Sequence, residues 1–251
     1  MTPDVLVDLW RSYTATPVSR EVHPSDRMSS HHGHDWAKYE VVGVSAARVI
    51  FASLALTPTH EVRRLLDFGS GYGRVSRHLQ ALFPNAERFF ADIDEDASSF
   101  CADRFGGVAV PSTRDFDRLG LPGDLDLIWV GSVFTHVTFT RMEQLFRSLA
   151  EHLAPGGTLV ATFHGELVIK VQRTRPIIHP PFWERIIADY ETQGVGHHPY
   201  GGANGADNWG VSLISPAKVA SLSKSTEFEQ MAHLHHAWAG FQDVGVWARS
   251  R

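Results

Sequence analysis

A short strand-like run followed by three closely spaced glycines and a helical pattern constrains the fold of this chain more than any other feature. The run is Arg64–Phe68 and the helical pattern is Arg74–Leu82. Between them lie Gly69, Gly71 and Gly73. Glycine permits a tight turn and a close approach of the backbone to a ligand, and the start of a helix offers free N–H groups to an anion. The pattern therefore predicts a ligand cradle between a strand and a helix.

Further short apolar runs alternate with helical patterns over residues 61–165. Strands are expected at 88–91, 107–110, 125–130 and 158–163, and helices at 97–105 and 139–153. This alternation predicts an α/β fold, with a doubly wound, mostly parallel sheet covered on both faces. Such sheets bind ligands beyond the carboxyl ends of their strands. We therefore expect the functional residues directly after the strands.

The chain of 251 residues is interpreted as a single domain, 1–251, with four parts. Residues 1–60 form an N-terminal lid and helix, with the helix at 35–56, and residues 61–165 form the ligand-binding core. Residues 166–210, which are rich in proline, glycine, histidine and aromatic residues, form an insertion on the substrate side. Residues 211–251 return to short apolar runs and are expected to complete the sheet.

The composition excludes several classes of protein. Hydrophobic residues make up 43% and charged residues 20%, and the net charge is −5 with no basic patch, which argues against a nucleic-acid partner. The single cysteine excludes an internal disulfide and a multi-cysteine zinc site. The longest uncharged apolar stretch, 49–60, is too short to span a bilayer. We expect a soluble, cytoplasmic protein without a membrane partner, and the oligomeric state stays open.

Two aspartates at strand ends limit the classes of ligand that the glycine loop could bind. A dinucleotide site would have the spacing G-x-G-x-x-G, whereas this loop has G-x-G-x-G. Asp67 lies just before the loop, where an anion suits a cationic ligand better than a pyrophosphate. Asp92, at the end of the second strand, can accept hydrogen bonds from both hydroxyls of a ribose.

Four segments resemble, in order, motifs of the class I S-adenosylmethionine (SAM)-dependent methyltransferases. They are Leu65–Gly73, Phe90–Asp94, Asp126–His136 and Leu153–Leu159. The resemblance implies a Rossmann-like sheet of seven strands, mostly parallel, with one antiparallel strand near the C-terminus. Five strands would come from 61–165 and two from 211–251. It also implies SAM as the cofactor and S-adenosylhomocysteine as the product.

The resemblance carries cofactor-binding roles over to matching residues. Asp67 would face the amino group of the methionine part, Asp92 would hold the ribose and Ile93 would flank the adenine. Many family members place an acid after the third strand, and here Ser112 takes that place. The remaining expected cofactor contacts are Gly69, Gly71, Gly73 and Gly131. The alternative is that the two aspartates are ordinary loop or helix-capping residues.

The residues after the fourth and fifth strands bear on the nucleophile that is methylated. Methyltransferases acting on a planar amide or nucleobase nitrogen commonly carry Asn/Asp-Pro-Pro-Tyr after the fourth strand, whereas this chain has Gly131-Ser132-Val133-Phe134. An alcohol must lose its proton as it attacks, and histidine is the usual base. His136 and His164 follow the two strands and are the candidate catalytic residues. The alternative for His136 is a structural role, because Ser-Val-Phe-Thr-His resembles a loop-orienting signature of the superfamily.

Aromatic and polar residues are the candidates for binding the acceptor. Aromatic faces stack on the C–H surfaces of a sugar and polar groups bind its hydroxyls, and Asp207 and Trp209 in the insertion fit this pattern. Tyr39 is expected on the N-terminal lid, and Trp238 belongs to a C-terminal segment that resembles methyltransferases found beside glycan and natural-product pathways. The alternative for the insertion is an ordinary surface elaboration.

A histidine-rich segment, 31–35, could in principle bind a metal, but its spacing is not that of a recognised site. No metal site is predicted, and any metal requirement stays open.

The sequence thus favours a SAM-dependent O-methyltransferase that acts on a hydroxyl of a saccharide or a glycosylated small molecule, with a histidine base. A natural-product or small-molecule methyltransferase with another nucleophile is an alternative. A SAM-binding domain without chemistry is a second alternative, against which the two histidines argue. An NAD-dependent oxidoreductase is disfavoured by the glycine spacing.

Overall fold

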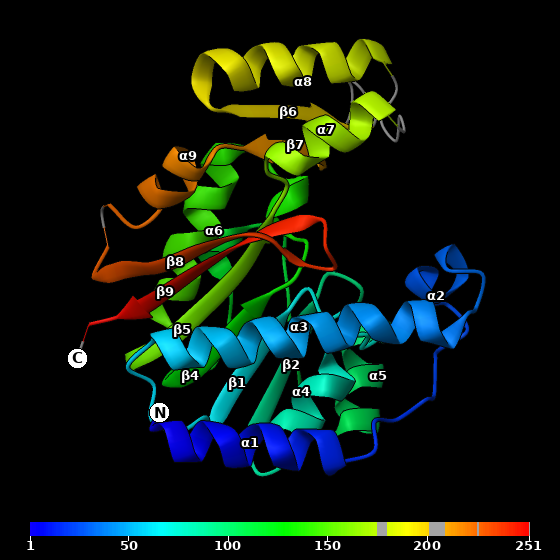
Figure 1. Ribbon diagram of the computed structural model, residues 1–251, viewed down its shortest axis with the longest axis vertical. Coiled ribbons are helices and arrows are strands. Elements are labelled where there is room, and N and C mark those ends of the chain that lie inside the picture. The colour runs from blue at the N-terminus through cyan, green and yellow to red at the C-terminus, as the bar shows by residue number, and fades with distance from the viewer. Residues whose placement is uncertain (175–179, 201–208, 225, 251) are drawn as a thin grey trace.

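A computed structural model of the chain describes residues 1–174, 180–200, 209–224 and 226–250. Its centre is a seven-stranded sheet with the order β3-β2-β1-β4-β5-β9-β8 (Figure 1). The strands are β1 (Arg64–Phe68), β2 (Glu87–Asp92), β3 (Val108–Pro111), β4 (Leu125–Val130), β5 (Leu153–Phe163), β8 (Phe228–Trp238) and β9 (Gln242–Arg249). The first five pair in parallel, and β9 runs antiparallel to both of its neighbours. The expected α/β fold is confirmed.

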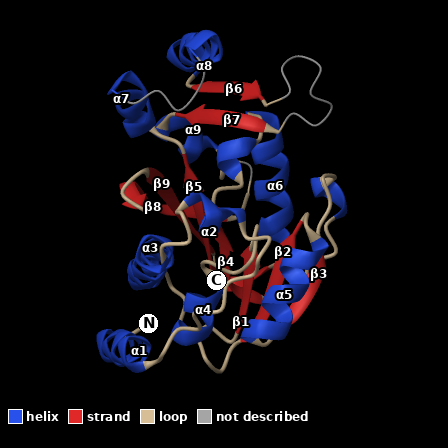
Figure 2. Ribbon diagram, turned by 90° about the vertical axis from the view of Figure 1, so that its right-hand side faces the viewer, coloured by secondary structure: helices blue, strands red, loops and turns tan. Residues whose placement is uncertain are grey.

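Helices cover both faces of this sheet (Figure 2). On one face lie α1 (Pro3–Ala15), α3 (Trp36–Leu56), α4 (Ser76–Leu82) and α5 (Glu95–Phe105). On the other face lie η1 (Phe116–Arg118), η2 (Phe134–His136), α6 (Phe139–Glu151) and α9 (Pro216–Ser221). Successive residues of each central strand therefore enter two different cores, which explains why these strands are apolar throughout.

Helix α3 begins at Trp36 because the Asp35 carboxylate accepts hydrogen bonds from the backbone N–H groups of Ala37 and Lys38. By length and composition α3 could cross a membrane, which the sequence interpretation had not considered. Half of its apolar window is buried inside this fold, where it packs on α4, β5 and β8. Its apolar character is thus explained by packing within the fold.

A separate layer, which we call the cap, lies beyond the carboxyl end of β5 and is seen at the top of Figure 1. It consists of α7 (Glu166–Thr174), α8 (Pro180–Gln193), β6 (Val195–Pro199) and β7 (Gly210–Ile214). The two strands pair with each other in antiparallel fashion and not with the main sheet. Val168, Ile186 and Leu213 form a small core of their own inside the cap. The cap therefore forms a separately packed layer beside the carboxyl ends of β4 and β5.

Candidate active site

The loop that joins β1 to α4 is held close to the end of β2. The backbone N–H of Gly69 donates to the carbonyl oxygen of Ala91 at 2.7 Å. Gly73 has φ +81°, and a Cβ added there would lie 2.2 Å from Cε2 of Phe105. Both the backbone conformation and the packing therefore require glycine at position 73. At Gly71, by contrast, an added Cβ would meet no atom within 4 Å, so the loop surface is open there.

Asp67 is a buried carboxylate at the end of β1. It accepts a hydrogen bond of 2.6 Å from the Ser76 hydroxyl, and among the described residues it has no ion-pair partner. Burial raises the pKa of Asp67 to about 7, and the nearby Asp92 carboxylate acts in the same direction, while the Ser76 hydrogen bond opposes the change. A cationic group bound beside Asp67 would stabilise its charged form.

Asp92, the last residue of β2, connects the glycine loop to the loop that follows β2. Its Oδ2 accepts from the backbone N–H of Gly71 at 2.8 Å, and its Oδ1 accepts from that of Asp94 at 2.9 Å. Burial raises its pKa, and these backbone hydrogen bonds oppose that change. The next residue, Ile93, leaves 54% of its surface exposed, although it is a large apolar side chain. Asp92 pairs with Pro111 at the end of β3, so Ser112 follows at the same edge of the sheet.

These features fit the cofactor that the motifs imply. The buried Asp67 carboxylate suits an ammonium group, the open surface at Gly71 leaves room beside the loop, and the exposed Ile93 offers an apolar contact to a flat base. When bound, SAM supplies an activated methyl group on a sulfonium centre. The roles of these residues toward SAM remain predictions from the motifs.

Replacing Asp92 with alanine should weaken SAM binding by about tenfold to a hundredfold. A hydrogen bond to a charged group is worth about 1.5–3 kcal/mol, and ~1.4 kcal/mol corresponds to a factor of ten. Asp92→Asn is the matched control, because it keeps one acceptor oxygen for the Gly71 N–H and should lose less affinity. Calorimetric titration of the folded variants with SAM measures both effects. Unchanged affinity in Asp92→Ala would remove Asp92 from the cofactor site.

The ends of β4 and β5 are joined by a polar ring that sequence reasoning did not identify. The N–H of Ser132 donates to the Thr162 hydroxyl at 2.8 Å, that hydroxyl donates to Oε1 of Gln242 at 2.6 Å, and Nε2 of Gln242 donates to the Ser132 hydroxyl at 3.0 Å. Ser132 adopts φ +61° directly after Gly131. A Cβ at Gly131 would lie 2.7 Å from Nε1 of Trp129. The ring therefore fixes the backbone at the position of the fourth motif.

His136 and His164 lie at the ends of β4 and β5, and both rings are tied to β7. Nδ1 of His136 lies 2.8 Å from the carbonyl oxygen of Gly210, and Nδ1 of His164 lies 3.2 Å from that of Ser212. Because a carbonyl oxygen only accepts hydrogen bonds, each Nδ1 must carry a proton. In the neutral ring the proton-accepting lone pair is therefore on Nε2.

Burial lowers the pKa of both histidines. The pKa of His164 falls to about 4, through burial first and then through the proximity of His136, while its bond to Ser212 opposes the change. Burial also lowers the pKa of His136, while its hydrogen bond to the Gly210 carbonyl oxygen acts in the opposite direction. Both rings are therefore neutral near pH 7 and able to accept a proton.

Aromatic residues of the cap contact His136. The Trp209 ring stacks on it with centroids 5.0 Å apart, and the Tyr200 hydroxyl lies 3.0 Å from Nδ1. Trp209 is 42% exposed, so this indole has a face available to a ligand. The structure thus brings Trp209 and His136 together, while Asp207 lies outside the described residues.

Tyr39 and Trp238 are buried and have partners inside the protein. The Tyr39 hydroxyl donates to Asp26 at 2.6 Å, and Nε1 of Trp238 donates to the carbonyl oxygen of Val42 at 3.1 Å. Trp238 also packs edge-on against Trp129. These contacts give both residues a packing role between α3 and the rest of the domain. They are not the exposed substrate contacts that the sequence interpretation expected.

The N-terminal segment lies against the glycine loop. The His23 ring stacks on Tyr72 of the loop with centroids 4.5 Å apart, and Nη1 of Arg77 donates to the carbonyl oxygens of Ser19 and Glu21. This arrangement is compatible with the expected N-terminal lid.

Residues 66–159 match the family model Methyltransf_12, described as a methyltransferase domain. No curated protein sequence matches the chain. Among solved structures, an amino pentose methyltransferase from Micromonospora echinaspora involved in calicheamicin biosynthesis superposes with a TM-score of 0.57 at 18% identity, covering 92% of this chain and 100% of that one. Human N-acetylserotonin methyltransferase superposes with a TM-score of 0.55 at 14% identity. The match covers 99% of this chain, which spans only 66% of that protein's length.

A third similar structure is the 1,6-didemethyltoxoflavin-N1-methyltransferase of Burkholderia thailandensis, with a TM-score of 0.56 and 13% identity over 100% of this chain and 92% of that one. At such identities the likeness shows a shared fold, and the substrates named for those proteins are theirs alone. The ordered motifs, the sheet order and the family-model match agree with one another. Residues 66–159 thus match a methyltransferase domain, the chain has the fold of SAM-dependent methyltransferases, and SAM is the cofactor that its motifs imply.

Proposed function

We propose that this protein transfers the methyl group of SAM to a hydroxyl of a saccharide or a glycosylated small molecule. The observation that carries the proposal is the pair His136 and His164, which are neutral and are oriented by β7 at the ends of β4 and β5. Locking Nδ1 onto a carbonyl oxygen keeps Nε2 available as a proton acceptor. This tautomer is the one that a general base for an alcohol needs.

The chemistry is an in-line displacement at the methyl carbon. The acceptor oxygen forms a bond to that carbon while the carbon–sulfur bond breaks, and the electron pair of that bond stays on sulfur in S-adenosylhomocysteine. The hydroxyl proton passes to Nε2 of a histidine as the oxygen attacks. Asp67 and Asp92 would hold the two polar ends of SAM, and the N-terminal segment would cover it. The protein then contributes alignment and a base.

We assign the base to His136. Proton transfer is most effective when the pKa of the base is near the working pH. His164 is the weaker base, because its pKa falls to about 4 and the proximity of His136 contributes to that decrease. Trp209 and Tyr200 also contact His136, and the contact with Trp209, a proposed acceptor-binding residue, supports this assignment.

The cap supports a saccharide acceptor. The exposed Trp209 ring is suited to stack on the C–H face of a sugar. The likeness to an amino pentose methyltransferase is in line with this assignment.

Replacing Trp209 with alanine should raise KM for a glycoside acceptor by about 2- to 10-fold, the equivalent of the 0.5–1.5 kcal/mol typical of an aromatic contact. KM for SAM should stay unchanged, because Trp209 belongs to the cap and not to the glycine loop. Steady-state kinetics with each substrate varied in turn measures both values. An unchanged KM for the glycoside would remove Trp209 from the acceptor site.

A further inference from the structure

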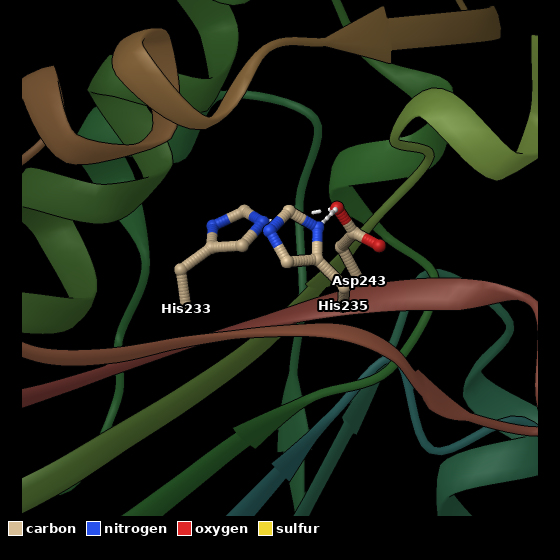
Figure 3. Close-up of side chains that lie close together, drawn as sticks. All are labelled: His233, His235 and Asp243. Carbon is tan, nitrogen blue, oxygen red and sulfur yellow. Dashed lines mark hydrogen bonds and ion pairs between the residues drawn. The ribbon is translucent and has the colours of Figure 1, made fainter.

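Two histidines and an aspartate lie together on the strand pair β8–β9 (Figure 3). Nε2 of His233 lies 2.9 Å from Oδ2 of Asp243, and Nδ1 of His235 lies 3.2 Å from the same oxygen. His233 and His235 are two residues apart on β8, so their side chains project to the same face of the sheet. The three candidate ligand atoms all lie within 4.8 Å of one another.

The spacing of these atoms is close to that of a metal centre. A tetrahedral ion with bonds of about 2.0–2.1 Å to nitrogen and oxygen separates neighbouring ligand atoms by roughly 3.3 Å. The two histidine nitrogens lie at 2.9 and 3.2 Å from the carboxylate oxygen, and the three atoms all lie within 4.8 Å of one another. Each nitrogen is thus near the required spacing from the oxygen, and an ion would draw the two nitrogens toward each other. Two imidazoles and one carboxylate suit zinc and similar divalent transition metals.

The surroundings hold the carboxylate in one orientation. Its other oxygen, Oδ1, accepts from the backbone N–H of His236 at 2.9 Å. Its Oδ2 accepts from both histidine rings, so both carboxylate oxygens have partners and the group is held in place. A fixed carboxylate is the kind of ligand whose orientation is set by outer-shell partners.

Access to the cluster comes from the side of His235. The side chain of Asp243 is 2% exposed, whereas that of His235 is 55% exposed. Asp243 pairs with Phe163 at the end of β5, and a Cβ added to Gly165 would lie 2.2 Å from Oδ2 of Asp243. The cluster therefore lies against the backbone that follows His164, beside the candidate active site.

We propose that His233, His235 and Asp243 bind one divalent transition-metal ion of the zinc type. Three protein ligands leave a fourth position for water or another small oxygen ligand, on the exposed side of His235. The ion would join β8 to β9 where the β8 register shifts between Leu234 and Trp238. The proposal does not depend on the identity of the methyl acceptor.

Calorimetric titration of the chelator-treated full chain with zinc chloride tests the site. We expect one equivalent of Zn²⁺ to bind, and we expect Co²⁺ to give the visible absorption of a tetrahedral site. The His235→Ala variant should bind no Zn²⁺ at this site, or bind it much more weakly. The loss of affinity should exceed about 10- to 100-fold, which is the usual effect of removing a residue that only supports a metal ligand. His235 is the ligand of choice because its exposed side chain can be removed without opening the core.

Asp243→Asn is the second variant, and His236→Asn is the matched control. His236 offers the Asp243 carboxylate only its backbone N–H, its ring packs edge-on against that of His235 without providing a ligand atom, and it adopts φ +53°, a conformation that asparagine tolerates. The control should bind Zn²⁺ with wild-type affinity, and circular dichroism should show that all three variants are folded. The proposal is overturned if the wild type binds no Zn²⁺, or if folded His235→Ala retains the same stoichiometry and affinity. The three residues would then form only a hydrogen-bonded link between β8 and β9.

Discussion

Replacing His136 with alanine should lower kcat by about 10²–10⁴-fold, the usual contribution of a positioned general base. SAM affinity should stay near that of the wild type, because His136 belongs to the rim formed by η2 and β7 and not to the glycine loop. His164→Ala should lower kcat by a smaller factor, because the pKa of His164 is about 4 and its ring is the poorer proton acceptor. Steady-state kinetics with a competent acceptor, combined with SAM titrations of the same samples, separates these effects.

His136→Asn distinguishes catalysis from structure. An asparagine amide can still donate to the carbonyl oxygen of Gly210, as Nδ1 does, but it has no counterpart to the basic Nε2. A base at position 136 predicts that the asparagine variant is as slow as the alanine variant. The acidic limb of the pH–rate profile, expected below pH about 6.5 because burial lowers the histidine pKa, should also disappear. Near-native kcat in His136→Asn would show that the residue only orients the loop.

Replacing Asp67 with asparagine should stabilise the SAM-free protein at alkaline pH. The pKa of Asp67 rises from an ordinary value of about 3.9 to about 7 in the folded state. The folded state therefore binds more protons than the unfolded state between these two values, and wild-type stability falls as pH rises through this range. Asp67→Asn removes the penalty of ionising a buried carboxyl, and its advantage should reach up to about 4 kcal/mol above pH 7.

Urea unfolding of both proteins at pH 5 and pH 8 measures this difference. The advantage of the variant should be roughly 2–3 kcal/mol larger at pH 8 than at pH 5, from the same linkage relation. Saturating SAM should reverse the order, because its ammonium group favours the ionised aspartate and binds the wild type better. A variant that is no more stable than the wild type at pH 8 would show that Asp67 ionises freely in the folded protein.

The strands and the glycine loop around the proposed cofactor site could be predicted from the sequence, because they depend on local sequence signals. The glycines, the acids at the ends of β1 and β2 and the apolar strands each depend on a few neighbouring residues. The bounds of β1 and β4 agree with the expectation, and β5 begins earlier, at Leu153, because Leu153 pairs with Leu125 across an irregularity. Helix α1 was not predicted, since its residues lie in a polar, amphipathic stretch that acquires a partner only when it packs on α3 and α4.

The substrate side depends on contacts between distant segments, which periodicity does not encode. The pairing of Gly210 and Ser212 with the two histidines brings together residues about 50–75 positions apart. The cluster of His233, His235 and Asp243 requires the β8–β9 register and its irregularity. Sequence alone showed two histidines at alternate positions and a later aspartate, a pattern too common to predict a site.

Transfer of an isotopically labelled methyl group from SAM to a panel of acceptors tests the proposed function most directly. The panel pairs glycosides that carry free hydroxyls with the same glycosides blocked at oxygen and with matched amino sugars, and mass spectrometry locates the label. We predict label on oxygen of a free-hydroxyl glycoside with the wild type, and loss of that product with folded, SAM-binding His136→Asn. Label on nitrogen alone, or oxygen labelling that is equally fast in His136→Asn, would contradict a histidine-assisted O-methyltransferase.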